Sequence, residues 1–326
     1  MNSPSPLCQY RMQVHHIHQE TPDVWTLSLI NHDVYPYQPG QFALVSIANS
    51  DRLRAYTLSS SPGHSQFISL TVRRVVGGQG SHWLTDQVKP GDYLWLSSAQ
   101  GEFSCQQEQA DRYLFLAAGC GVTPIMSMCR WLVAERPEAD VQVIYCVRTP
   151  EDIIFADTWR SLDNRLRLTV YTERGGGATH QPGRLHLAAL RAEVPDIAAR
   201  TVMICGPAPW MAQQQADVQA LGAVKVLLER FHTPAPVLSN GRFTLTRTRP
   251  LATLDAPVGV SLLAALEAGQ WPITAACRAG VCGCCKTRIT AGPYHSTSTQ
   301  TLNENEIADG YVLACSCYPD GDIVMV

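Results

Sequence analysis

Short segments in which apolar and polar residues alternate follow one another over the first hundred residues, separated by Pro and Gly at close intervals. In the segment 67–73, Ile68, Leu70 and Val72 share one face of an extended strand, and polar residues occupy the positions between them. One face of such a strand packs in a core and the other is polar. The pattern from about residue 10 to residue 102 therefore predicts an antiparallel β-barrel.

The pattern changes after residue 111, where apolar runs alternate with stretches of helical periodicity. The predicted strands span residues 113–118, 141–146 and 201–205, and the predicted helices span residues 125–135 and 210–221. The runs are typical of strands buried on both faces of a parallel sheet. The helices stop before Pro137 and at Gly222, which are ordinary stop signals. An α/β domain with two or three βα units is expected here.

Residues 232–241 contain Pro234, Pro236 and a final Ser-Asn-Gly, a composition that disfavours both helix and strand. We interpret this segment as a linker. Beyond it we predict strands at 243–248 and 323–326, and a helix that Ser261 caps and that ends at Gly269. The predicted division of the chain is 8–105, 110–232, a linker at 233–242, and 243–326.

The composition indicates a globular protein with more than one domain. The chain has 326 residues, enough for two or three domains, and its charged fraction of 16% is below the ~25% of an average protein. The net charge is −3 and no run of like charge is present. The basic surface expected of a nucleic-acid-binding protein is therefore absent, and DNA and RNA are not expected partners.

The apolar segments are all shorter than the ~20 residues of a membrane span, and residues 1–11 lack the layout of a secretory signal. Six of the twelve cysteines fall within the last fifty residues. A chain of this size needs no disulfide scaffold, so we expect free thiols in a reducing compartment and a cytoplasmic protein.

Four cysteines form the pattern C-x4-C-x2-C-x29-C, which is typical of a plant-type 2Fe-2S cluster site. The predicted ligands are Cys277, Cys282, Cys285 and Cys315. Gly280 and Gly283 allow the tight loop that turns backbone N–H groups toward sulfur. A structural zinc site built from Cys282, Cys285, Cys315 and Cys317 is the alternative, although the first gap of four residues favours the cluster. Cys284 and Cys317 are expected to be small buried side chains.

The segment 54–60 combines a cation, an aromatic ring and hydroxyl groups on one extended stretch, Arg-Ala-Tyr-Thr-Leu-Ser-Ser. The ring of Tyr56 can stack on a planar cofactor while hydroxyls and backbone amides reach its edge. The segment 77–81, Gly-Gly-Gln-Gly-Ser, opens a helix-like stretch whose amides and Ser81 hydroxyl can face phosphate oxygens. An ordinary strand and a glycine-rich hairpin turn are the alternatives.

Two further segments end strands of the predicted parallel sheet, where ligands bind in such folds. In the segment 118–124, Ala-Gly-Cys-Gly-Val-Thr-Pro, Thr123 is the predicted N-cap of the next helix and Pro124 lies in its first turn. The segment 205–207, Cys-Gly-Pro, closes the strand 201–205. An inert buried side chain is the alternative for Cys205.

Charges near residue 148 favour a dinucleotide without a 2′-phosphate, which among the nicotinamide nucleotides is NADH. Arg148 ends the strand that should face the adenosine ribose, where an arginine can bind a 2′-phosphate. Glu151 and Asp152 follow closely and would repel that phosphate.

These segments together resemble the ferredoxin-NADP reductase superfamily, which has an R-x-Y-[ST] stretch, a later G-x-x-S, a G-G-x-G-x-T-P loop and a C-G-P segment. The resemblance implies FAD, in preference to FMN, held by Arg54, Tyr56, Thr57, Leu58, Ser59, Val72, Arg73, Gly80 and Ser81. It implies nucleotide contacts from Gly119, Gly121, Thr123, Pro124, Arg148, Gly206 and Pro207, with Cys205 beside the nicotinamide as the candidate catalytic residue. Glu229 and Phe231 resemble the terminal E-x-F near the flavin.

The region from about 243 to 326 resembles the plant-type ferredoxin domain, which implies an α+β (β-grasp) fold around the cluster. The domain order resembles that of phthalate-dioxygenase-type reductases. Over nearly the whole chain, and most clearly at 11–16, 147–155 and 276–286, the sequence resembles the NADH reductases of hybrid cluster proteins.

That resemblance implies a reductase that passes electrons from NADH through FAD and a 2Fe-2S cluster to a hybrid cluster protein engaged in nitric oxide detoxification. The alternative is the reductase component of a Rieske-type or other multicomponent oxygenase. A zinc-binding or scaffold protein without flavin represents a third, non-enzymatic class.

Overall fold

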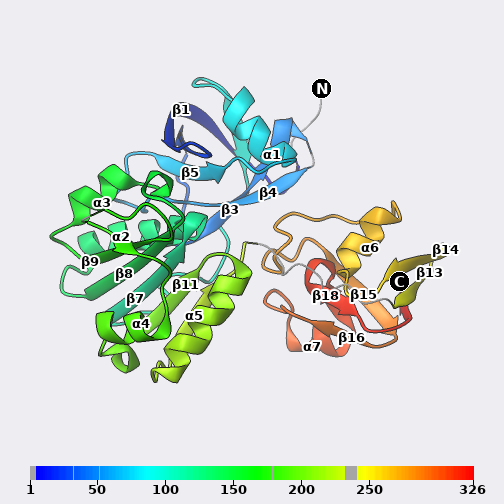
Figure 1. The fold of residues 1–326 in the computed structure, drawn as a ribbon. Helices are drawn as coiled ribbons and strands as arrows, with labels where there is room; N and C mark the ends of the chain where they lie inside the picture. Colours follow the sequence, from blue (N-terminus) through cyan, green and yellow to red (C-terminus); the bar gives the residue numbers. More distant parts are fainter. Residues whose placement is uncertain (1–4, 32, 51, 178, 232–240) are drawn as a thin grey trace. The chain divides into compact units, whose positions relative to one another are not determined.

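The computed structural model describes the chain except for residues 1–4, 32, 51, 178 and 232–240. The chain divides into two compact units, Met1–Arg230 and Phe231–Val326 (Figure 1). Most of the predicted linker, 233–242, lies outside the described residues. Each unit has its own core and is considered by itself.

The first part of unit 1 is the predicted antiparallel barrel. Its six strands run in the order β4-β3-β6-β1-β2-β5. The strands are β1 (Tyr10–Thr21), β2 (Val24–Ile30), β3 (Phe42–Ser46), β4 (Leu53–Thr57), β5 (Ile68–Arg73) and β6 (Tyr93–Leu96). A bridge between Leu58 and Leu70 joins the two ends of this order. Residues just after β4 therefore lie beside β5, although they are distant in the strand order.

The alternation predicted for β5 is observed, with one refinement on its polar face. Leu70 and Val72 are fully buried in the barrel core. Thr71, on the opposite face, is also buried, and its hydroxyl lies 2.9 Å from the Thr26 hydroxyl and 2.8 Å from the Ser59 hydroxyl. The Thr71 hydroxyl thus contacts hydroxyl groups of the adjacent strand β2 and of the segment after β4.

The second part of unit 1 is a parallel α/β sheet in the order β10-β9-β8-β7-β11-β12. Its strands are β7 (Arg112–Ala118), β8 (Asp140–Val147), β9 (Arg167–Thr172), β10 (Gln181–Pro182), β11 (Thr201–Cys205) and β12 (Val226–Glu229). Helices α2 (Val122–Glu135) and α3 (Ala156–Leu162) cover one face, and α4 (Leu187–Glu193) and α5 (Ala208–Ala220) cover the other (Figure 1). The strand order reverses between β7 and β11, which creates a crevice at their carboxyl ends.

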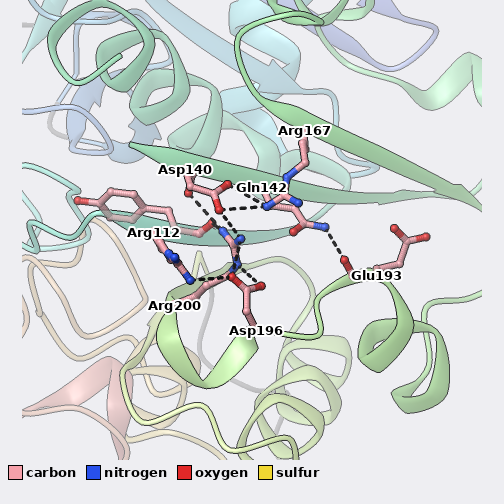
Figure 2. Close-up of polar contacts among 8 residues, drawn as sticks. Arg112, Asp140, Gln142, Arg167, Glu193, Asp196 and Arg200 are labelled. Atoms are coloured by element: carbon pink, nitrogen blue, oxygen red, sulfur yellow. Dashed lines mark hydrogen bonds and ion pairs between the residues drawn. The ribbon is translucent and has the colours of Figure 1, made fainter. Parts of the chain in front are cut away.

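Arg200 ties the opposite, amino-terminal edge of this sheet together (Figure 2). Only 3% of this residue is exposed. Its guanidinium donates to the Asp196 carboxylate at 2.9 Å from both Nε and Nη2, and to the Asp140 carboxylate at 2.6 Å. It also donates to the backbone carbonyls of Tyr113 and Asp140 at 3.1 and 3.2 Å, so all five of its N–H donors are used. The hydrogen bonds from Arg200 lower the pKa of Asp196.

Unit 2 contains a five-stranded mixed sheet in the order β14-β13-β19-β15-β17, and a separate pair of β16 with β18. The strands are β13 (Arg242–Thr248), β14 (Leu251–Pro257), β15 (Lys286–Ala291), β16 (Tyr294–Ser296), β17 (Tyr311–Leu313), β18 (Cys317–Pro319) and β19 (Ile323–Met325). The Ser261 hydroxyl caps α6 (Leu262–Ala268) by accepting from the Ala264 N–H, and α7 (Glu304–Ala308) precedes β17. The predicted cap, helix and α+β fold are therefore present.

Within the described residues, none of the helices has the length and apolar character needed to cross a membrane.

Replacing Arg200 with Met tests whether this cluster holds the sheet edge. The variant leaves buried carbonyl groups without a donor, and we expect a loss of about 2–3 kcal/mol in the free energy of unfolding. Urea unfolding measures this loss. Arg112→Ala is the matched control, because Arg112 pairs with the same Asp196 but its side chain is 52% exposed, so the variant should lose no more than about 0.5 kcal/mol. Equal losses in the two variants would contradict the assignment.

Candidate functional site

Most of the predicted flavin residues lie on β4, on β5 and in the segment that follows β4, and the other two, Gly80 and Ser81, lie in the turn after β5. Arg54, Tyr56 and Thr57 belong to β4, and barrel closure brings the next residues beside β5. Tyr56 is half-buried, and burial raises the pKa of its phenol to about 12, so the ring stays neutral. A neutral, partly buried aromatic ring is suited to stacking on a planar cofactor.

Leu58 and Val72 lie differently from the other predicted flavin residues. Both side chains are fully buried in the barrel core. A flavin outside the barrel wall can therefore meet only their backbone groups. Flavin binding by Leu58 and Val72 therefore remains a prediction for their backbone amides and carbonyls, which can form hydrogen bonds with a flavin.

The turn predicted to bind phosphate packs directly against Arg54. Gly80 and Ser81 belong to a one-turn helix, α1 (Gln79–His82), which continues into the π-type turn Trp83–Gln87. A Cβ on Gly80 would lie 3.0 Å from the Arg54 Cγ, so a side chain here would fit only if Arg54 shifted. The Ser81 hydroxyl donates to the Gly78 carbonyl at 2.9 Å and accepts from the Val75 N–H at 3.0 Å. The Ser81 hydroxyl hydrogen is thus already donated within the turn.

The nucleotide loop lies at the switch point of the parallel sheet. Gly119–Gly121 form a 3-10 turn between β7 and α2, and the N-cap of α2 is Gly121. The prediction of Thr123 as N-cap was wrong, because the helix begins two residues earlier and the Thr123 hydroxyl donates to the Cys120 carbonyl at 3.0 Å. Pro124 lies in the first turn, as predicted.

The loop after β7 packs against the loop after β11. β7 and β11 pair in parallel with Ala117 opposite Cys205. A Cβ built on Gly121 would lie 2.0 Å from the Cys205 carbonyl oxygen and 2.7 Å from the Gly206 nitrogen. The sheet therefore brings the two predicted nucleotide segments into backbone contact.

Cys205 is a neutral, fully buried thiol. Its sulfur lies 3.9 Å from the Glu229 carboxylate, and burial raises the pKa of Cys205 well above its usual value. Burial also raises the pKa of Glu229 to about 8. A buried thiol with a raised pKa is a poor nucleophile, which is compatible with a role for Cys205 in shaping the site. Phe231 begins unit 2, and its place beside the flavin remains a prediction.

Arg148 contacts two carboxylates. Its Nη2 and Nε donate to the Asp152 oxygens at 2.8 and 3.1 Å, and Nη2 lies 3.8 Å from the Asp23 carboxylate of the barrel. The same Asp23 oxygen lies 3.3 Å from the Nε of Arg73. The sequence indicated the role of Asp152, but nothing in it marked Asp23.

The four predicted cluster ligands converge in unit 2. Cys277, Cys282 and Cys285 lie on the loop before β15, and Cys315 lies in the 3-10 turn Ala314–Ser316. Backbone N–H groups donate to their sulfurs: Ala279 to Cys277 at 3.4 Å, Gly280 to Cys315 at 3.2 Å and Cys315 to Cys285 at 3.4 Å. Hydrogen bonds from the Cys282 and Cys315 thiols lower the pKa of Cys277.

The loop geometry fits a group held by thiolates. Gly280 and Gly283 have φ of +73° and +74°, and a Cβ on Gly280 would lie 2.7 Å from the Ser298 Cβ. No three His, Cys, Asp or Glu side chains in the described part of the chain are arranged to hold a single metal ion. A 2Fe-2S cluster requires no such group, because each of its irons takes two protein ligands.

Three other residues complete the cluster region. Cys317 is fully buried in the core of unit 2, as predicted, whereas Cys284 is only half-buried. Sequence reasoning missed Arg278, which has a φ of +57° and donates to both carboxylate oxygens of Glu267 on α6, at 2.9 and 2.5 Å. This ion pair anchors the ligand loop to a helix.

Three domain families match the chain in the predicted order. An oxidoreductase FAD-binding domain matches residues 12–105, an oxidoreductase NAD-binding domain matches residues 115–217, and a 2Fe-2S iron-sulfur cluster binding domain matches residues 246–320. The expected cofactors, FAD, a nicotinamide nucleotide and a 2Fe-2S cluster, are therefore confirmed at the level of domains.

The chain is 56% identical, over the full length of both proteins, to the NADH oxidoreductase HCR of Escherichia coli K12. It is 30% identical to a glycine betaine monooxygenase reductase subunit of Pseudomonas aeruginosa, covering 94% of this chain and 92% of that protein. The solved structure of a phthalate dioxygenase reductase has the same fold, with a TM-score of 0.67, 22% identity and 97% of each chain covered.

The ligand assignment predicts different results for two neighbouring cysteines. Cys315→Ser should lose or strongly perturb the visible spectrum of the 2Fe-2S cluster, because it removes one of four thiolates. Cys317→Ser should keep the spectrum, since Cys317 lies in the core. Absorption and electron paramagnetic resonance spectra of the purified variants, with iron and sulfide analysis, provide the measurement. An intact signal in Cys315→Ser would falsify the ligand set.

The backbone contact at the switch point predicts that Gly121 tolerates no side chain. Gly121→Ala should weaken 5′-AMP binding by roughly 10- to 100-fold, because overpacking of this size costs about 1–3 kcal/mol. Calorimetric titration measures the affinity. Gly177→Ala is the control, because a Cβ there meets no atom within 4 Å. Unchanged affinity in Gly121→Ala would show that the two loops need not touch.

Proposed function

This chain belongs to the family of the NADH oxidoreductase HCR of Escherichia coli, and from that premise we propose that it feeds electrons from NADH to a hybrid cluster protein. The observation that carries the proposal is the presence of three domains in one chain, each with its predicted binding segment. FAD, when bound, accepts a hydride and releases electrons singly, which matches a two-electron donor to a one-electron cluster.

The residues of unit 1 orient the two reactants of the hydride transfer. Tyr56 offers a neutral ring to one of them, and the contact of Gly121 with Cys205 and Gly206 fixes the loops that are expected to hold the other. Hydride transfer needs no acid or base, so a buried neutral thiol at Cys205 suits a purely steric role.

The identity of the acceptor rests on similarity over the whole chain. The segments 11–16, 147–155 and 276–286 resemble the NADH reductases of hybrid cluster proteins outside the general motifs, and this supports a role in nitric oxide detoxification. The oxygenase reductases, at 30% identity, support the alternative acceptor more weakly. None of the twelve cysteines forms a disulfide, which is compatible with the proposed cytoplasmic location.

Electron order provides the test of the relay. In Cys285→Ser, stopped-flow mixing with NADH should bleach the bound flavin at a rate near that of the wild type, because the flavin residues lie in unit 1. Ferricyanide reduction should survive, and delivery to the protein acceptor should fail. Cys317→Ser is the matched control and should deliver electrons normally. Normal delivery from Cys285→Ser, or no reduction of wild-type flavin by NADH, would refute the relay.

The acceptor is tested separately. Purified wild-type protein should reduce a hybrid cluster protein from the same cell faster than it reduces a Rieske oxygenase component at equal concentration. Faster reduction of the oxygenase component would replace the proposed acceptor with the alternative one.

A further inference from the structure

Arg148 lies at the carboxyl end of a strand of the nucleotide domain. It directly follows β8, the neighbour of β7 in the parallel sheet. β7 carries the loop Gly119–Gly121, which the proposed function assigns to the nucleotide phosphates. An arginine at the end of the next strand is placed to receive a 2′-phosphate on the adenosine ribose. The side chain is 57% exposed, so a ligand in solution can reach it.

A carboxylate of the same loop already occupies the guanidinium. Asp152 accepts two hydrogen bonds from Arg148, at 2.8 and 3.1 Å, in the bidentate geometry that a phosphate would need. Asp152 is itself held by the Thr149 N–H at 3.2 Å and the Thr149 hydroxyl at 3.3 Å. The Asp152 side chain is only 14% exposed, so these contacts hold it in place beside Arg148.

The second carboxylate comes from the flavin barrel. Asp23, in the turn between β1 and β2, lies 3.8 Å from Arg148 and 3.3 Å from Arg73. The Thr21 hydroxyl donates to its other oxygen at 3.0 Å. Arg73 also lies close to the nucleotide loop. Its Nη1 is 3.3 Å from the position that a Cβ on Gly119 would take. Asp23 therefore lies between Arg148 and the arginine that borders the loop.

We infer that Asp23 and Asp152 together mask a latent 2′-phosphate site at Arg148, so that a residue of the flavin barrel helps to select NADH over NADPH. The inference rests on the proposed function, which places the nucleotide at this loop. The two carboxylates would do more than repel the 2′-phosphate of NADPH, because they already bind the arginine, Arg148, that this phosphate would need. Removing both negative charges should release Arg148 for a phosphate.

The test uses the full chain and two probes that need no redox chemistry, 2′,5′-ADP and 5′-AMP. Asp23→Asn and Asp152→Asn keep the shape and an acceptor oxygen while removing the charge. In the double variant, calorimetric titration should show 2′,5′-ADP binding tightened by roughly tenfold or more, the effect of one charge-assisted contact, with 5′-AMP affinity unchanged. Each single variant should show a smaller gain, and either can be used if the double variant does not fold.

Two further variants separate the inference from a general change in charge. Glu20→Gln removes a barrel carboxylate that accepts from the Phe155 N–H of the same loop at 3.0 Å, and it should leave both affinities unchanged. Arg148→Ala in the double variant should abolish the gain for 2′,5′-ADP. An unchanged 2′,5′-ADP affinity in the double and single variants, or a gain that survives Arg148→Ala, overturns the inference. Failure of the proposed function would be seen elsewhere, as wild-type flavin that NADH does not reduce.

Discussion

The close backbone contact between Gly121 and the Cys205 carbonyl is the constraint on which the redox site depends. It exists because β7 and β11 are adjacent parallel strands that end at the same edge of the sheet. The absence of a side chain at one position lets two loops from distant parts of the sequence meet. At the other edge, Arg200 joins the start of these strands with five hydrogen bonds, so the sheet is fixed at both ends.

The barrel and the nucleotide domain form one unit through polar contacts with defined partners. The Ser127 hydroxyl of α2 donates to the Ser60 carbonyl at 2.5 Å, and Arg130 donates to the Ser59 carbonyl at 2.9 Å. These contacts connect the end of the flavin segment to the helix that begins at the nucleotide loop. A flavin and a nucleotide bound to these two segments would therefore be held by one continuous framework, which orientation-dependent hydride transfer requires.

In unit 2, a cluster site would bring several negatively charged sulfurs into a small space, and the fold must stabilise them. Backbone N–H groups from the ligand loop and from the Cys315 turn donate to the thiolates, and the positive φ angles of Gly280 and Gly283 turn the chain toward them. The ion pair of Arg278 with Glu267 then fixes the loop to α6. The site thus combines a local loop conformation with an ion pair to a neighbouring helix.

The sequence by itself indicated the order of the domains, several strands and helices of each, and the spacing of the four candidate cysteines, because these depend on spacing and periodicity that are local in the chain. The N-cap of α2 was misplaced by two residues, since helix caps depend on backbone geometry that neighbouring side chains only bias. The alternation in 67–73 already placed Val72 on the core face, but tertiary structure alone decided that Leu58 faces the barrel core and that Asp23 lies beside Arg148. These contacts join residues far apart in the sequence, and only the closure of the barrel and its packing on the parallel sheet bring them together.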